Sequence, residues 1–312
     1  MNLRDLEYVV AVADHGHFGR AADACRVSQP TLSGQILKLE AELGLRLFDR
    51  EGRGARVSAQ GATVVAEARA TLAAAAGVSA AAVAARDPFA GLLRVGVIAT
   101  VAPYLLPIAL PAAIKALPRT PLHLVEDLTD RLLARLRDGA LDGAVIATEP
   151  RDPKLAAIDL YQEPFFLVTA GRGRVRGRAS IRVEEIDPST LLLLSDGHCL
   201  RDQALALCKA PGRGAHGPDV RATSLETLHH LAAAGQGTTL APLLAYAGWR
   251  RARAGVVGIR VVGEGASRTV RLVFRRDSPR EAALNALAAS LSASADRALA
   301  TARALADRVG SR

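Results

Sequence analysis

The chain has 312 residues, 50% of them hydrophobic, and a formal net charge of +9. This length is sufficient for two domains and a third compact unit. Its three cysteines exclude a disulfide-stapled secreted fold. The chain begins with charged residues, and its richest apolar stretch, Thr71–Ala85, is shorter than the roughly 20 residues of a bilayer span, so we expect a cytoplasmic protein without a membrane partner.

The positive charge does not by itself locate a binding surface. Residues 1–87 contain 10 Lys+Arg and 10 Asp+Glu, which leaves 30 and 21 for the remainder of the chain. A net positive charge is typical of proteins that bind a polyanion. Here the excess lies outside the first 87 residues, so charge alone does not assign the partner.

The first 60 residues are predicted to form three helices and a hairpin. Apolar residues at helical spacing predict one helix over 3–13 and another over 18–25. Ser28 is a favourable N-cap for a third helix, which ends at Gly44. Two short apolar runs around a Gly/Arg tip predict a β-hairpin wing over 45–57. An Ala-rich helix is then expected over 58–85, ending before Pro88.

Beyond Gly91, short apolar runs alternate with helical segments. This alternation predicts an α/β sheet domain. A Gly/Arg-rich stretch at 171–178 lacks the strand, loop and helix order of a phosphate-binding loop, so we assign no nucleotide or other cofactor. A last helix of Ala and Leu is expected over 279–309. The predicted strands lie at 92–98, 122–125, 144–147, 165–169 and 191–194.

The second and third helices have the arrangement of a helix-turn-helix, whose second helix enters the major groove of DNA. Ser33, Gln35 and Lys38 are expected to share one face of that helix. Gln reads adenine edges, Lys contacts phosphate or guanine, and wing arginines reach the backbone or minor groove. A small structural three-helix domain with a solvated polar face fits the periodicity equally well. The predicted DNA-contacting residues are Ser28, Pro30, Thr31, Ser33, Gln35, Lys38, Arg50 and Arg53.

Cys199 and Cys208 lie nine positions apart, and the only other cysteine, Cys25, falls on the apolar face of the second helix. Residues 200–208 are predicted to form a short helix, in which nine steps of about 1.5 Å separate the two Cα atoms by roughly 13 Å. A disulfide tolerates only about 7 Å between Cα atoms. If the pair is a thiol switch, oxidation must therefore unfold this helix. Without further context, two such cysteines are more often buried apolar residues.

The sequence around Cys199 favours a reactive thiolate. His198, Arg201 and the start of a helix would each lower the pKa of the Cys199 thiol. A thiolate that reacts with peroxide becomes a sulfenic acid, which condenses with a second thiol to form a disulfide. Cys208 is the candidate for that second, resolving thiol.

Several motifs occur together in the first 61 residues. They are Phe18-Gly19-Arg20-Ala21-Ala22, Ser28-Gln29-Pro30-Thr31-Leu32-Ser33, Leu47-Phe48-Asp49-Arg50 and Gln60-Gly61. This segment closely resembles the winged-helix domain of LysR-type transcriptional regulators. Residues 99–107, 196–204 and 221–228 resemble the peroxide-sensing members of that family.

The resemblance implies a domain organisation and partners. It implies a winged helix-turn-helix over 1–58, a linker and dimerisation helix over 59–87, and a sensor domain over 91–312 of periplasmic-binding-protein type. The sensor's two α/β subdomains would be roughly 91–161 with 268–312, and 162–267. It further implies a homotetramer, a dimer of dimers, that binds double-stranded operator DNA and RNA polymerase. Such a protein activates or represses oxidative-stress genes and is neither an enzyme nor a metalloprotein.

The resemblance also implies roles in the sensor domain. Cys199 would be the peroxidatic thiol, with Cys208 as its resolving partner. Thr100 and Thr129 would hold hydrogen peroxide near Cys199, and each follows a predicted strand, where ligand clefts of α/β sheets lie. His198, Asp202 and Arg201 would assist binding and proton transfer.

Three other functions remain open. The first is a LysR-type regulator that binds a small metabolite between the subdomains, with the cysteines incidental. The second is a cysteine peroxidase, which the N-terminal DNA-binding unit argues against. The third is a Zn or Cu site at His198, Cys199 and Cys208, which lacks a fourth ligand and would need nine-apart residues to meet.

Overall fold

The computed structural model describes residues 1–49, 54–171, 178–207, 221–252 and 255–307. The chain divides into two compact units, Met1–Ala82 and Val83–Arg312. Each unit has its own hydrophobic core, and the two are described separately.

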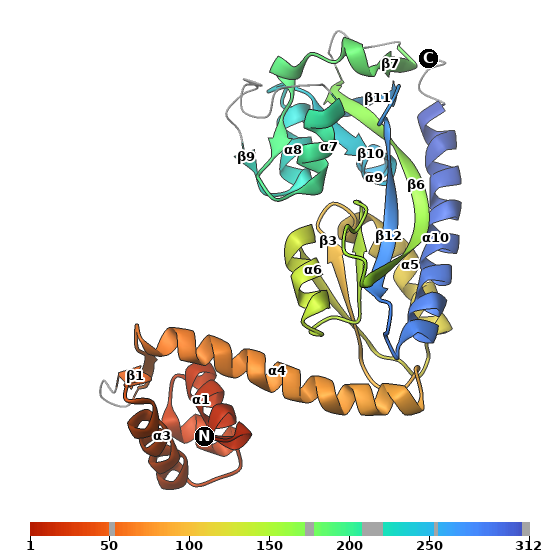
Figure 1. Cartoon of the computed structure of the whole chain (residues 1–312). Helices are drawn as coiled ribbons and strands as arrows, with labels where there is room; N and C mark the ends of the chain where they lie inside the picture. The colour runs from red at the N-terminus through yellow and green to blue at the C-terminus, as the bar shows by residue number, and fades with distance from the viewer. Residues whose placement is uncertain (50–53, 172–177, 208–220, 253–254, 308–312) are drawn as a thin grey trace. The chain divides into compact units, whose positions relative to one another are not determined.

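The first unit consists of helices and a short hairpin (Figure 1). The Ser28 hydroxyl caps α3 by accepting from Thr31 N, and Gly44 ends the helix in the left-handed conformation at φ 70°. The Glu40 carboxylate accepts from Leu47 N and Phe48 N, which fixes the hairpin on α3. The elements are α1 (Leu3–His15), α2 (Phe18–Ala24), α3 (Gln29–Leu43), β1 (Phe48–Asp49), β2 (Arg56–Val57) and α4 (Gly61–Arg86). The three helices, the hairpin and the long helix predicted from the sequence are thus confirmed.

Helix α4 is more apolar than the sequence analysis allowed. It has 26 residues and contains a window with mean hydropathy 1.4, so by length and composition alone it could cross a membrane. The apolar stretch considered from the sequence was 71–85 alone, whereas the helix begins at Gly61. Val65 and Ala68 are buried in the core of the first unit, and the helix also carries Glu67 and Arg69, charges that are costly inside a bilayer.

The second unit is built on a mixed sheet with strand order β4, β3, β5, β12, β6, β11 and β7, and β10 also pairs with β6. Its order places parallel strands β4, β3 and β5 at one end, next to the antiparallel strand β12. The strands are β3 (Leu93–Ile98), β4 (Leu122–Asp127), β5 (Gly143–Ile146), β6 (Leu155–Ala170), β7 (Ser180–Arg182), β10 (Thr239–Pro242), β11 (Val256–Val262) and β12 (Ser267–Arg275). A separate parallel pair joins β8 (Leu193–Leu194) to β9 (Arg221–Ala222).

Helices cover this sheet and connect its strands. α7 follows β8 and ends at Leu207, and α10 packs against α5, α9 and β6. The helices are α5 (Ala102–Ala116), α6 (Thr129–Arg137), α7 (Cys199–Leu207), α8 (Leu225–Ala233), α9 (Leu243–Arg251) and α10 (Glu281–Asp307). Two short 3-10 turns are η1 (Val183–Glu185) and η2 (Pro188–Thr190). The helices predicted after Cys199 and at the C-terminal end are confirmed.

Strand β6 divides the second unit into two lobes. Residues 155–164 of β6 pair with β12, and residues 165–170 pair with β10 and β11. We call the part with β3, β4, β5, α5 and α6 the first lobe, and the part with β7 to β11 and α7 to α9 the second lobe (Figure 1). Because β6 and β12 run between the lobes, the junction is a continuous piece of sheet.

The prediction for β6 was too short. Only 165–169 was expected, whereas the strand begins at Leu155. Asp159 and Glu163 interrupt its apolar pattern, as Arg268 and Arg271 do in β12, which was not predicted. These charged side chains have ion-pair partners across the two strands, and that pairing is not visible in a periodicity argument.

Candidate redox site and DNA-binding helix

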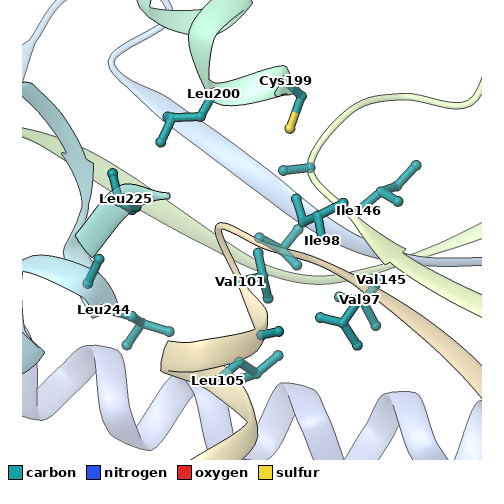
Figure 2. Packing of buried hydrophobic residues seen from close by; sticks show 14 of the residues in the cluster. Val97, Ile98, Val101, Leu105, Val145, Ile146, Cys199, Leu200, Leu225 and Leu244 are labelled. Atoms are coloured by element: carbon teal, nitrogen blue, oxygen red, sulfur yellow. The ribbon is translucent and has the colours of Figure 1, made fainter. Parts of the chain in front are cut away.

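Cys199 is the first residue of α7 and is 8% exposed. Gly197 precedes it at φ 91°, a conformation that favours glycine, and turns the chain from β8 into the helix. Figure 2 shows the sulphur pointing away from α7 toward the part of the first lobe that carries Ile98 and Ile146. The thiol therefore lies at the junction of the lobes and belongs to the apolar core of the unit.

A buried arginine, Arg268 of β12, is the charged centre of this junction. Its guanidinium forms an ion pair with Glu163 of β6 at 2.7 Å, and both side chains are 1% exposed. It also donates to the hydroxyl and to the carbonyl oxygen of Thr100, each at 3.0 Å. Glu163 in turn accepts from Leu244 N at the start of α9. One network thus joins β12, β6 and β3's C-terminal end to the second lobe.

Arg268 and Glu163 were not among the site residues predicted from the sequence. Both fall in segments that were not assigned to strands, and neither lies in a motif. The apolar run Thr-Val-Arg-Leu-Val-Phe of β12 contains Arg271, whereas Arg268 precedes the run, so no local pattern marked Arg268 as a buried charge.

The surroundings of Cys199 act on its thiol in opposite directions. Burial raises the pKa of the Cys199 thiol, and the Asp202 carboxylate also raises it. The Arg268 guanidinium lowers the pKa most, followed by a hydrogen bond with Thr129 and the Leu200 backbone N–H. Burial outweighs these groups, so the expected depressed pKa is wrong for this conformation.

The two groups expected to lower that pKa do not do so. Burial lowers the pKa of His198, so its imidazole is neutral near pH 7. Arg201 forms an ion pair with Asp196 at 3.0 Å and donates to Leu194 O at 3.0 Å. Successive helix residues are rotated by about 100°, so Arg201 lies about 200° around α7 from Cys199, whereas Asp202 returns to the same side.

The two threonines occupy different positions. Thr129 begins α6, and its hydroxyl is buried. Within the described residues this hydroxyl has no partner at ordinary hydrogen-bond distance. It is nevertheless near enough to Cys199 to lower the pKa of the thiol. Thr100 is 3% exposed, and its hydroxyl accepts from Arg268. Thr129 therefore faces Cys199. Thr100 instead binds Arg268, whose charge acts on the Cys199 thiol.

A groove of about 910 Å³ opens beside Cys199. Thr129 and Asp202 border it next to the thiol, and an ion pair between Arg137 and Asp152 at 2.9 Å lies farther along. The side chains around it are mostly charged or polar, so it admits small polar molecules. Its other lining residues are Asp130, Leu133, Thr148, Glu149, Pro150, Arg151 and Gly197.

The chain has two further cysteines, Cys208 and Cys25. Cys208 lies outside the described residues, so its distance from Cys199 is not given by the structure. Cys25 ends α2, is partly buried and packs against the core of the first unit, as predicted. Burial raises the pKa of the Cys25 thiol.

The predicted DNA-reading helix α3 carries its polar residues as follows. Pro30, Thr31 and Lys38 are exposed, and the Ser28 and Thr31 hydroxyls are 2.7 Å apart. Ser33 and Gln35 are each half-buried and lie about 200° apart around the helix, so the expectation of one shared face with Lys38 is wrong. They flank the exposed face on opposite sides. Arg50 and Arg53 lie outside the described residues.

Comparison with known proteins identifies the family. Residues 3–62 match the bacterial regulatory helix-turn-helix protein, lysR family, and residues 86–296 match the LysR substrate binding domain. The chain is 40% identical over 296 residues to the "DNA-binding transcriptional dual regulator OxyR" of Escherichia coli strain K12, covering 95% of this chain and 96% of that protein.

Two solved structures are similar over nearly the whole chain. A full-length OxyR variant from Pseudomonas aeruginosa has a TM-score of 0.66 and 36% identity, covering 93% of this chain and 94% of that one. A mutant of Corynebacterium glutamicum OxyR with bound H2O2 has a TM-score of 0.65 and 36% identity, covering 97% and 95%. The chain belongs to the LysR family of bacterial transcriptional regulators and, within it, to the OxyR group.

Proposed function

We propose that the protein is a transcriptional regulator that senses hydrogen peroxide through Cys199. The single observation that carries this is a thiol at the start of α7 that borders an open groove and faces Thr129 and Arg268. The relatives it resembles are named as hydrogen peroxide-inducible genes activators, and one is seen with H2O2 bound. The proposed signal is accordingly hydrogen peroxide.

The proposed chemistry begins with loss of the Cys199 proton. The thiolate sulphur attacks one peroxide oxygen, the O–O bond breaks, and the second oxygen leaves as hydroxide and takes a proton to become water. Arg268 stabilises the thiolate, and Thr129 is placed to donate to peroxide in the groove. Asp202 lines the same groove and neutral His198 adjoins the thiol, so these two are the candidates for moving protons.

Thr100 and Arg201 receive indirect roles. Thr100 holds the Arg268 guanidinium through its hydroxyl and its carbonyl, which positions the positive charge. Arg201 ties α7 to Asp196 and to Leu194 O. We therefore place Arg201 with the residues that hold α7 in its helical state.

The second proposed step is attack of the Cys208 thiol on the Cys199 sulfenic acid, which forms the disulfide and releases water. Eight helical steps of about 1.5 Å separate Leu207 from Cys199 by about 12 Å, and a residue bonded to Leu207 is about 3.8 Å from it. With α7 intact, the Cα atoms of the pair are thus at least about 8 Å apart, beyond the reach of a disulfide. We therefore propose that bond formation unwinds at least part of α7.

Unwinding α7 costs free energy, and this cost separates the helical state from the unwound state. Leu200 and Leu207 are 2% and 6% exposed, and each contributes about 1.5–3 kcal/mol of burial. The reduced protein retains this stabilisation, and formation of the disulfide must offset its loss. A rearrangement of this size in the second lobe provides the signal for the rest of the molecule.

The remaining assignments concern partners and organisation. We propose operator DNA as the partner of α3 and the wing, with Ser28, Pro30, Thr31 and Lys38 nearest the duplex and Ser33 and Gln35 at its margins. We propose a homotetramer that contacts RNA polymerase in the cytoplasm and acts as a regulator without turnover. The proposed boundaries are 1–58, 59–87 and 91–312, with sensor subdomains at roughly 91–161 with 268–312, and 162–267.

One observation favours a second candidate function. The groove of about 910 Å³ is far larger than hydrogen peroxide and holds Arg137, Arg151 and several carboxylates. A small polar metabolite would fit it, and a LysR-type regulator that responds to such a ligand would need no cysteine chemistry. Ligand-dependent DNA binding that persists in a Cys199→Ser variant would favour this function.

The test of the proposed function combines chemistry with DNA binding. The full-length protein is treated with stoichiometric peroxide, alkylated and mapped by mass spectrometry, while operator footprints are recorded before and after. We expect a Cys199–Cys208 disulfide with a changed footprint, a trapped Cys199 sulfenic acid in Cys208→Ser, and no response in Cys199→Ser. Cys25→Ser is the matched control. A normal footprint change in Cys199→Ser would contradict the proposal.

A further inference from the structure

Helix α8 gathers three metal-ligating side chains that the redox chemistry does not use. Glu226, His229 and His230 occupy positions i, i+3 and i+4, which meet on a helix surface. One carboxylate oxygen and one nitrogen from each imidazole all lie within 4.8 Å of one another. Glu226 and His230 are exposed, so the cluster is open to solvent, while His229 is buried behind them.

The Glu226 carboxylate is held in a fixed orientation. Its Oε1 accepts from Tyr104 Oη at 2.8 Å and from Trp249 Nε1 at 2.9 Å. Oε2 lies 3.7 Å from His229 Nδ1, so one oxygen is anchored and the other is directed at the imidazole.

The His229 ring is also fixed in place. It stacks on the Trp249 indole, with ring centroids 4.6 Å apart and planes at 14°. His229 is 4% exposed, whereas its neighbour His230 is exposed, with ring centroids 4.7 Å apart. Two ligands are therefore preorganised by α5 and α9, and the third can rotate toward them.

We propose that Glu226, His229 and His230 form a binding site for a divalent transition-metal cation such as zinc. Two imidazoles and one carboxylate are a common protein ligand set for Zn²⁺, with water completing the tetrahedron. Zn–N and Zn–O bonds of about 2.0–2.2 Å place two ligands about 3–4 Å apart, so rotation of His230 must close the remaining gap. Tyr104 and Trp249 act as the outer partners that orient the carboxylate.

The site would also tie metal binding to the lobe junction. Tyr104 belongs to α5 of the first lobe, whereas Glu226 and Trp249 belong to α8 and α9 of the second. A cation on Oε2 leaves the hydrogen bonds to Oε1 intact. Metal binding is therefore compatible with the existing hydrogen bond between the lobes.

The test uses the full-length reduced protein, without any affinity tag, titrated with Co²⁺ and followed by visible absorption. We expect one Co²⁺ per chain with d–d bands of nitrogen and oxygen ligands and without the intense near-ultraviolet band of thiolate coordination. His230→Ala and Glu226→Gln should each weaken binding by about tenfold or more. The exposed His123 on β4 offers the matched control, and His123→Ala should bind as the parent does.

Three outcomes would overturn the assignment. They are no cobalt binding by the parent, unchanged affinity in His230→Ala, or spectra that show thiolate ligands and vanish in Cys199→Ser. Circular dichroism of each variant checks that α8 is folded. Glu226→Gln preserves an acceptor for Tyr104 and Trp249, so it removes the ligand charge while keeping the neighbouring contacts.

Discussion

Removal of Arg268 should slow the oxidation of Cys199 and should also destabilise the sensor unit, and the two effects can be separated. Arg268→Met leaves Glu163, 1% exposed, as an unpaired buried carboxylate. Breaking a buried ion pair in this way costs about 3–5 kcal/mol. For a domain of this size each kcal/mol lowers the unfolding midpoint by about 2–4 °C.

The double variant Arg268→Met with Glu163→Gln isolates the reactivity. Replacing both charges removes the unpaired buried carboxylate, so the double variant should lose less stability than Arg268→Met alone. Arg268 is the strongest group that lowers the pKa of the Cys199 thiol, so its removal raises that pKa further. The thiolate fraction at neutral pH then falls, and we expect slower oxidation in the double variant; a tenfold slower rate would correspond to a rise of about one pKa unit.

The assay is rapid-quench oxidation of Cys199 by peroxide in a Cys208→Ser background, read by mass spectrometry. Arg271→Met is the matched control, because Arg271 lies on the same strand and pairs with the exposed Asp159. Glu163→Gln alone reports any effect of the carboxylate. An oxidation rate in the double variant equal to that of Arg271→Met would refute the role given to Arg268.

Three further predictions concern the pH dependence of oxidation, the disulfide potential and DNA binding. Because burial raises the pKa of the Cys199 thiol, its oxidation rate in Cys208→Ser should keep increasing with pH above the ordinary thiol pKa; a rate that is flat across neutral pH would contradict this. Leu200→Ala should destabilise only the helical, reduced state, by about 2–5 kcal/mol, and so make the disulfide potential about 40–110 mV more negative in a glutathione titration. Gln35→Ala should alter the sequence preference of DNA binding, whereas Arg56→Ala on the wing should weaken binding to specific and random duplexes alike. Equal losses of affinity for both duplexes in Gln35→Ala would show that Gln35 contacts the DNA backbone.

Elements with strong local signals were predictable from the sequence. The caps at Ser28 and Gly44 and the apolar spacing between them define α3 almost to the residue. The helix after Cys199 was predicted for the same reason, since Leu200, Ala204 and Leu207 form one apolar face. These signals depend on neighbours within about one turn of helix.

The errors arose where contacts between distant segments decide the outcome. Glu163 and Arg268 are 105 positions apart, and only their pairing makes charged residues acceptable in buried strands. The predicted depression of the Cys199 pKa was wrong because burial, which depends on distant segments, outweighs the groups that lower it. The strongest of those groups is Arg268, and not His198 or Arg201. Arg201 could have been excluded beforehand, since two helical steps turn its side chain away from Cys199.

The central claim is that α7 keeps the two thiols apart until oxidation unwinds it. Amide hydrogen exchange across residues 199–207, measured for the reduced protein and for the isolated disulfide form, tests this directly. We predict protection in the reduced state, as expected for a helix with Leu200 and Leu207 buried, and a loss of protection by orders of magnitude after oxidation. Unchanged protection on formation of the Cys199–Cys208 bond would contradict the claim.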